Sequence, residues 1–243
     1  MNKLKLLLAL CLFSTIFCNS QELTIGIKGG VNYSFIGDIN SRGGSLSGFP
    51  VDEVFTPNKE LGTQFGGLVM VRFGSLMLRG EILFSKQKNY YEFPSRNSYW
   101  NSSRTEIPLI IGYEVFKPFS PYVGINATST SKLTIDGLEN DLTYDKRDLN
   151  PIIGLLVDFG RFGVDVRYEL STTEEPYFDA NFVNNSTQGQ PGYGINSADI
   201  YPYKLGVLSL SAHINLFTTD KDRMGSFFGG LFKGDKCYCP YDN

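Results

Sequence analysis

Charged side chains recur at alternate positions within several apolar segments of the chain. Side chains two residues apart on a strand point to the same face, so these acids and bases would gather in one place. Gathered there, they could line a polar path for ions, form a ligand site, or pair with one another and fill the space between them. The residues are Lys28, Arg72, Arg79, Glu81, Glu106, Asp158, Asp165, Arg167 and Glu169.

A catalytic base would have to be His213, the only histidine in the chain. It shares a face with Ser211, whereas a membrane-embedded lipid enzyme needs a base that a third group orients near the bilayer surface. We therefore expect an ordinary hydrogen bond for His213 and no catalytic residue. Cys237 and Cys239 lack the number and spacing of zinc ligands, so a local disulfide or a cross-link is expected there, with no metal or cofactor.

The elements that carry these residues are predicted to be about eight β-strands. From Glu22 to Phe35, apolar residues at odd positions alternate strictly with small or polar residues at even positions, which is the period of a strand with two unlike faces. The same alternation recurs at 65–73, 76–85, 106–115, 122–131, 152–159, 162–171 and 208–216. Pro108 cannot donate to a ladder, so we expect a bulge or a strand mouth there.

The connections between these strands alternate in length. Gly74-Ser75, 117–120 and Gly160-Arg161 are short, whereas 36–61, 92–103, 132–147 and 172–202 are long and polar. Long loops at one end and tight turns at the other, with an even number of strands, are typical of a closed, up-and-down transmembrane β-barrel of the outer membrane. The loops would be extracellular and the turns periplasmic.

The charges indicate which face points inward. A dry core does not tolerate unpaired charge, so the polar face is predicted to line the barrel and the apolar face to meet lipid. A soluble lipocalin-like barrel or β-sandwich, the alternative, would need a polar exterior. Because eight strands leave only enough interior for side chains, we favour a plug of salt bridges in which Arg72, Arg79 and Arg167 face Glu81, Glu106, Asp165 and Glu169.

Aromatic residues are predicted to form two girdles at the membrane interfaces. Phe73, Phe116, Phe119, Phe159, Phe162 and Phe217 lie near the short turns, and Tyr33, Phe35, Tyr90, Tyr91, Tyr99 and Trp100 lie near the long loops.

The first twenty residues predict export. A basic start, an apolar stretch from Leu6 to Phe17 and small residues before Gln21 indicate a signal peptide over 1–20. Lipidation of Cys18 is disfavoured by the bulky Phe17 before it. The barrel would then occupy 21–217 and a periplasmic tail 218–243. With 22 Lys and Arg against 25 Asp and Glu, the chain has no basic field for nucleic acid.

Several short motifs, taken in order, resemble the PorT-like outer membrane β-barrel family of Gram-negative bacteria. They are Gly26-Ile27-Lys28-Gly29-Gly30-Val31-Asn32, Arg79-Gly80-Glu81-Ile82-Leu83-Phe84-Ser85, Glu106-Ile107-Pro108-Leu109, Pro121-Tyr122-Val123-Gly124 and Asp165-Val166-Arg167-Tyr168. The resemblance implies a small barrel with long outer loops and no catalytic residues, and it implies a possible role in an outer membrane secretion system. The chain departs from the family in continuing beyond Phe217.

We therefore expect a non-enzymatic outer membrane protein of the cell envelope. It would act through its surface loops or periplasmic tail, in binding or in a secretion or assembly system, with membrane lipid and an envelope protein as partners. The alternatives are a narrow transport element for small solutes and, less favoured, a lipid-modifying enzyme.

Overall fold

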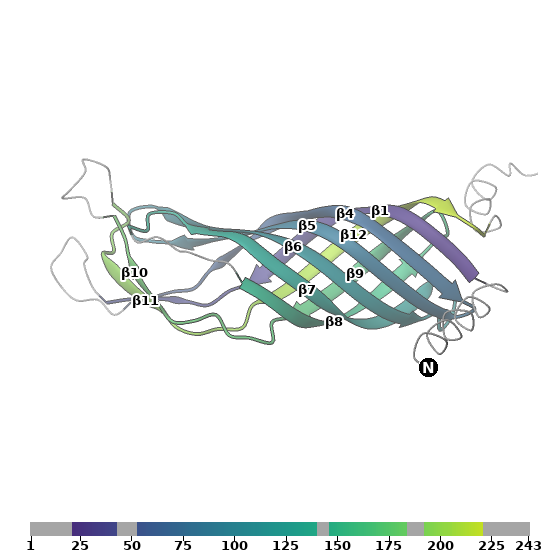
Figure 1. Cartoon of the computed structure of the whole chain (residues 1–243). Helices are drawn as coiled ribbons and strands as arrows, with labels where there is room; N and C mark the ends of the chain where they lie inside the picture. Colours follow the sequence, from purple (N-terminus) through teal and green to yellow (C-terminus); the bar gives the residue numbers. More distant parts are fainter. Residues whose placement is uncertain (1–20, 43–52, 140–145, 184–191, 221–243) are drawn as a thin grey trace, which may run out of the picture.

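The computed structural model describes residues 21–42, 53–139, 146–183 and 192–220, and these residues form two β-sheets (Figure 1). The predicted signal peptide and most of the predicted tail, including Cys237 and Cys239, lie outside the described residues. Within the described ranges, no helix has the length and apolar character needed to cross a bilayer.

The larger sheet is a closed antiparallel barrel of eight strands in the order β1-β12-β9-β8-β7-β6-β5-β4. Its strands are β1 (Gln21–Phe35), β4 (Asn58–Phe73), β5 (Leu76–Glu92), β6 (Asn97–Tyr113), β7 (Phe119–Ile135), β8 (Lys146–Asp158), β9 (Phe162–Leu170) and β12 (Gly206–Thr218). β1 and β12 join the two ends of the chain and close the ring. The predicted all-β class and the eight-stranded barrel are confirmed.

Tight reversals join strands at one end of the barrel, as predicted. Gly74 and Gly160 have φ values of 60° and 88°, a left-handed conformation that glycine adopts without steric cost. At the other end several strands run well past their predicted limits. β5 and β6 each span 17 residues, so the predicted loop over 92–103 shrinks to the four residues between Glu92 and Asn97.

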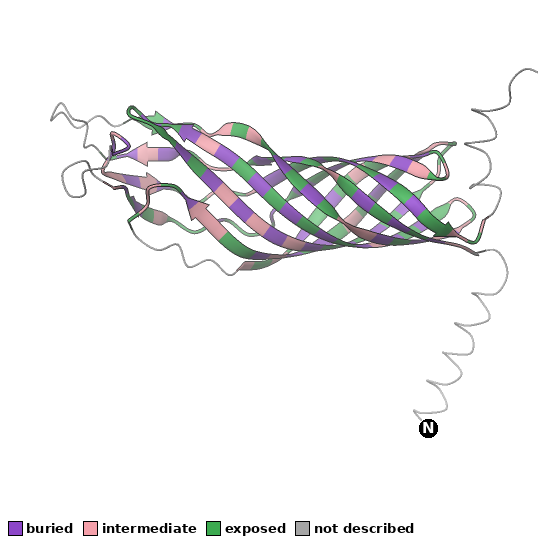
Figure 2. Ribbon diagram, turned by 90° about the horizontal axis from the view of Figure 1, so that it is seen from above, coloured by how far each residue is buried: buried purple, intermediate pink, exposed green. Residues whose placement is uncertain are grey.

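Burial alternates residue by residue along most of each barrel strand (Figure 2). On β5, for example, Met77, Arg79 and Glu81 are buried, whereas Leu78 and Ile82 are 42% and 55% exposed. The barrel therefore turns its charged face inward and its apolar face outward, as the charges indicated. Pro108 is buried in the middle of β6, and the β5–β6 register is the same on both sides of it, so the expected bulge or strand mouth is wrong.

The smaller sheet covers the loop end of the barrel. It has the order β10-β11-β2-β3, with β2 (Ile39–Ser41), β3 (Val54–Phe55), β10 (Phe178–Asn181) and β11 (Ser197–Ile200). Together with the residues that pack beneath it, this sheet is called the cap. Its core comprises Ile39, Phe55, Tyr91, Phe93, Trp100, Ile135, Ala180, Phe182, Tyr193, Ile195, Ala198 and Ile200.

The cap corrects two sequence predictions. The long connections are not simply polar loops, because the described parts of all four contribute apolar side chains to one core. Tyr91 and Trp100 do not join an outward aromatic girdle, since both are buried in that core, whereas Tyr33 and Phe35 are each 38% exposed. The ring of Phe93 lies at the centre of the core, 4.8 Å from the ring of Phe55 and 5.1 Å from that of Phe182.

Candidate functional site: a charged barrel interior beneath the cap

All nine charged residues singled out in the sequence are buried inside the barrel. Strand alternation accounts for this placement, because each belongs to the inward set of its strand. The barrel brings them together in three groups, at the turn end, at mid-height and towards the cap. Arg72 and Asp158 form the first group with Glu114, and Glu106 and Glu169 belong to the third.

At mid-height, the carboxylate of Glu81 is shared by three cations. It lies 3.1 Å from Nζ of Lys28, 2.9 Å from Nε of Arg79 and 2.8 Å from Nη2 of Arg167. β5 and β9 are four strands apart in a ring of eight, so the contact between Glu81 and Arg167 spans the barrel from wall to wall. An ion pair of this kind across the diameter obstructs a passage at that level.

Asp165 completes this central cluster from the opposite wall. It pairs with Arg79, again between β9 and β5, and lies 3.3 Å from Nζ of Lys28. Tyr122 on β7 donates a hydrogen bond of 2.8 Å to Oδ1 of Asp165, the oxygen that also contacts Lys28. Two carboxylates are therefore held by three cations and a phenol, an arrangement in which each charge has a partner, as burial requires.

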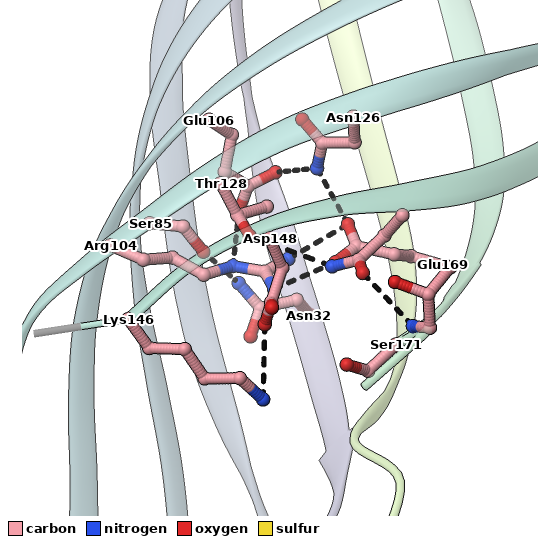
Figure 3. Close-up of polar contacts among 12 residues, drawn as sticks. Asn32, Ser85, Arg104, Glu106, Asn126, Thr128, Lys146, Asp148, Glu169 and Ser171 are labelled. Atoms are coloured by element: carbon pink, nitrogen blue, oxygen red, sulfur yellow. Dashed lines mark hydrogen bonds and ion pairs between the residues drawn. The ribbon is translucent and has the colours of Figure 1, made fainter. Parts of the chain in front are cut away.

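The cluster nearer the cap is organised around Arg104, which the sequence analysis did not single out (Figure 3). Its guanidinium bonds Glu106 at 2.8 Å and Glu169 at 2.9 Å, and these carboxylates also accept hydrogen bonds from the amide of Asn126. Asn150 donates a further bond of 2.9 Å to Glu169. Arg104 lies two residues before Glu106 and therefore on the same inward face of β6. Extending the predicted alternation by two residues towards the N-terminus would have identified it.

At the turn end, Arg72 on β4 reaches across to Asp158 on β8 at 2.6 Å, again four strands away, and also contacts Glu114 at 3.2 Å. The predicted pairing of Arg72 with Glu81, Glu106, Asp165 or Glu169 is therefore wrong. An apolar cluster that includes Met70 and Met77 packs inside the barrel between Arg72 and the central cluster.

His213 is buried on the inward face of β12. Neither of its ring nitrogens has a hydrogen-bond partner among the described residues, so the expected ordinary hydrogen bond is not found there. Its ring lies against Gly163, where a β-carbon would come within 2.5 Å of Cε1. Among the described residues, no carboxylate bonds a ring nitrogen of His213, as the orientation of a catalytic base would require.

No protein-family model matches the chain. No curated protein matches it either. Solved structures to which it is similar include Neisserial surface protein A (13% identity, TM-score 0.42, covering 80% of this chain and 99% of that one). Ail of Yersinia pestis, solved with the heparin analogue sucrose octasulfate, is 14% identical, with a TM-score of 0.43 and coverage of 81% and 99%. The outer membrane protein OprG from Pseudomonas aeruginosa is 14% identical, with a TM-score of 0.42 and coverage of 80% and 96%. The described residues form an all-β structure, a closed antiparallel barrel of eight strands with ion pairs across its interior and a folded cap.

Proposed function

We propose that this protein is a non-enzymatic outer membrane β-barrel that binds an external partner through its cap. The observation that carries the proposal is the combination of a barrel interior spanned by ion pairs with loops that fold into a second sheet with its own core. A barrel whose interior is crossed by ion pairs and whose loops fold into a sheet is suited to binding a partner through the surface of those loops.

The apolar exterior supports the membrane placement. All eight strands carry large apolar residues on their outward face, among them Ile27, Phe65, Ile82, Leu109, Val123, Ile153, Val166 and Leu210. On β5 the apolar positions extend from Leu76 to Phe84, or roughly 27 Å along the strand. At the usual strand tilt of ~40° this length is about 20 Å along the barrel axis, which is close to a lipid-facing band of ~25 Å. Soluble monomers rarely expose an apolar surface of this extent, because its contact with water is unfavourable.

The exterior of the cap supports a binding role. Tyr177 and Tyr201 are 50% and 55% exposed with ring centroids 6.1 Å apart, and Val54 on β3 is 57% exposed. Exposed tyrosines on a rigid support supply contact area at a small cost in conformational entropy, as at many protein interfaces. The resemblance to the PorT-like family favours a protein of an envelope or secretion complex as the partner.

Transport of small solutes is the second candidate, and the filled interior argues against it. The three groups of ion pairs would have to separate before a solute could pass, and separating buried pairs is costly. Catalysis is disfavoured by the position of His213, which lies inside the barrel and away from the lipid surface.

The orientation is tested by labelling intact cells with a membrane-impermeant maleimide. In a background with Cys237 and Cys239 replaced by serine, Val54→Cys in the cap should react, and Lys117→Cys at the turn end should react only after the outer membrane is permeabilised. The reverse pattern, or recovery of the protein in the soluble periplasm, would overturn the membrane placement.

The binding role is tested with a photo-crosslinking amino acid at Tyr201 and, as a control, at the lipid-facing Val123. We expect a discrete protein adduct at position 201 that position 123 does not give, and no single-channel conductance from the purified barrel in planar bilayers. Stable conductance without an adduct would favour transport instead.

A further inference from the structure

Two glycines open a hollow in the apolar exterior of the barrel. Gly67 on β4 and Gly80 on β5 both belong to the outward set, and the hollow of about 460 Å³ there is also lined by Ile25, Val69, Ile82 and Leu109. A β-carbon on Gly67 would lie 3.7 Å from the nearest atom, the carbonyl oxygen of Gly26, and one on Gly80 would lie 3.7 Å from Leu109. The backbone therefore does not require glycine at either position, although glycine weakens a strand.

A second hollow lies directly above the first, towards the cap. Its volume is about 230 Å³, and its lining combines the ammonium-bearing Lys86 with hydroxyl groups and the rings of Phe65 and Phe84. The outward hydroxyl groups belong to Thr63, Ser103, Thr105 and Ser131, whereas the hydroxyl of Ser85 lies on the inward face and accepts a hydrogen bond from Asn32. Register shifts in two strand pairs, between Glu60 and Thr63 and between Ser103 and Arg104, border this hollow. Bulges bend strands and often accompany binding sites.

The ladder between β4 and β5 makes the two hollows neighbours. Thr63 is opposite Lys86, and the next outward pair is Phe65 opposite Phe84, whose ring centroids lie 5.6 Å apart. The pair after that is Gly67 opposite Ile82. One molecule with a polar head and an apolar chain would thus meet a cation and hydroxyls above the phenylalanine pair and a bare apolar groove below it.

The positively charged side chains on this side of the barrel favour binding of a lipid with an anionic headgroup. Lys86 makes no ion pair and no side-chain hydrogen bond with a described residue. Exposed cations gather above the apolar band on β4 to β8, namely Lys59, Lys86, Lys88, Lys132 and Arg147, whereas the outward acids on these strands are Glu92 and the half-buried Glu60. A basic cluster at the edge of an apolar band attracts anionic lipid headgroups.

We infer that these hollows bind the lipid A part of lipopolysaccharide. Lys86 holds a phosphate, the hydroxyls bond the glucosamine, and an acyl chain lies in the groove over Gly67 and Gly80. The choice of lipid A rests on the proposed orientation, which puts the upper hollow in the outer leaflet. A hollow that presents several hydroxyl groups beside a cation also suits a phosphorylated sugar better than it suits a glycerol phosphate.

Native mass spectrometry of the full-length barrel in mild detergent tests this inference. The added probes are bisphosphorylated lipid A, the same lipid with both phosphates removed, and phosphatidylglycerol. Lys86→Gln removes the cation and Gly67→Leu fills the groove. The matched controls are Lys117→Gln at the turn end and Ala212→Leu on the outward face of β12. An unchanged heat-dependent gel shift establishes that each variant is folded.

We expect wild-type protein to retain one lipid A more tightly than either other lipid. Lys86→Gln should weaken retention about fivefold, the effect of one cation near an anionic surface, and Gly67→Leu should weaken it at least as much, while both controls bind as wild type does. Equal binding of dephosphorylated lipid A or phosphatidylglycerol, or equal losses in the controls, would overturn the inference. If Val54→Cys is labelled on intact cells and lipid A is not retained, only the lipid site fails; if Val54→Cys is not labelled, the orientation fails too.

Discussion

Replacing Glu81 by glutamine removes one charge from the centre of the barrel and leaves its volume almost unchanged. Three cations lie within 3.1 Å of this carboxylate, and the side chains of all four residues are at most 3% exposed. Removing one partner of a buried ion pair costs ~3–5 kcal/mol, because the remaining charge is left without compensation in a medium of low dielectric. Since water barely reaches these groups, we expect Glu81→Gln to lower the free energy of unfolding by the same ~3–5 kcal/mol.

The assay is urea unfolding of the barrel refolded into lipid vesicles, followed by the fraction that migrates as the compact form on an unheated gel. Asp179→Asn in the cap is the control, because its pair with Arg42 has side chains 53% and 43% exposed; exposed pairs contribute ~0–1 kcal/mol. Adding Lys28→Met to Glu81→Gln removes one of the surplus cations and should recover part of the loss.

A loss in Glu81→Gln no larger than that in Asp179→Asn would refute this reasoning. It would mean that water screens the central cluster and that the interior is hydrated, in which case the argument against conduction would fall with it.

Two further predictions concern neighbouring glycines and the cap. A β-carbon at Gly66 would lie 1.9 Å from the carbonyl oxygen of Ile82, so Gly66→Ala should prevent barrel assembly, whereas Gly67→Ala should assemble with stability within ~1 kcal/mol of wild type; equal gel shifts in both would contradict this. Burial raises the pKa of Tyr91 and of Tyr203 above that of an ordinary phenol. Their contribution to stability is therefore complete below pH ~10, where an unfolded tyrosine ionises, and is lost as the pH rises further. The emission of Trp100, the only tryptophan and a member of the cap core, should shift to the red above that pH while the barrel stays compact.

Sequence alone predicted the barrel because the inward and outward faces differ in character along the part of every strand whose outward face is apolar. The upper ends of the strands were missed because that difference disappears there. On β5, the outward Lys86 and Lys88 and the inward Gln87 and Asn89 are all polar, so the segment loses the amphipathic alternation that marks a strand.

The cap was missed for a different reason. Its core brings together residues from four connections that are far apart in the chain, and pairings such as that of β11 with β2 are set by tertiary contact. The inward position of the charged residues was predicted from the alternation of side chains along each strand. Which acid pairs with which base was not predicted. Arg72 pairs with Asp158 rather than with the acids of the other two groups because both residues lie near the turn end.

The pairing of β1 with β12 has a consequence for how the protein is made. The first strand can satisfy the backbone donors and acceptors on its free edge only when the last strand of the barrel is available, nearly two hundred residues later. Until then the growing sheet has two open edges, which lipid cannot hydrogen-bond. In the proposed membrane placement the barrel therefore cannot insert strand by strand, and β1 and β12 must be held together, by a cellular factor or by collapse at the membrane surface, before the sheet enters the bilayer.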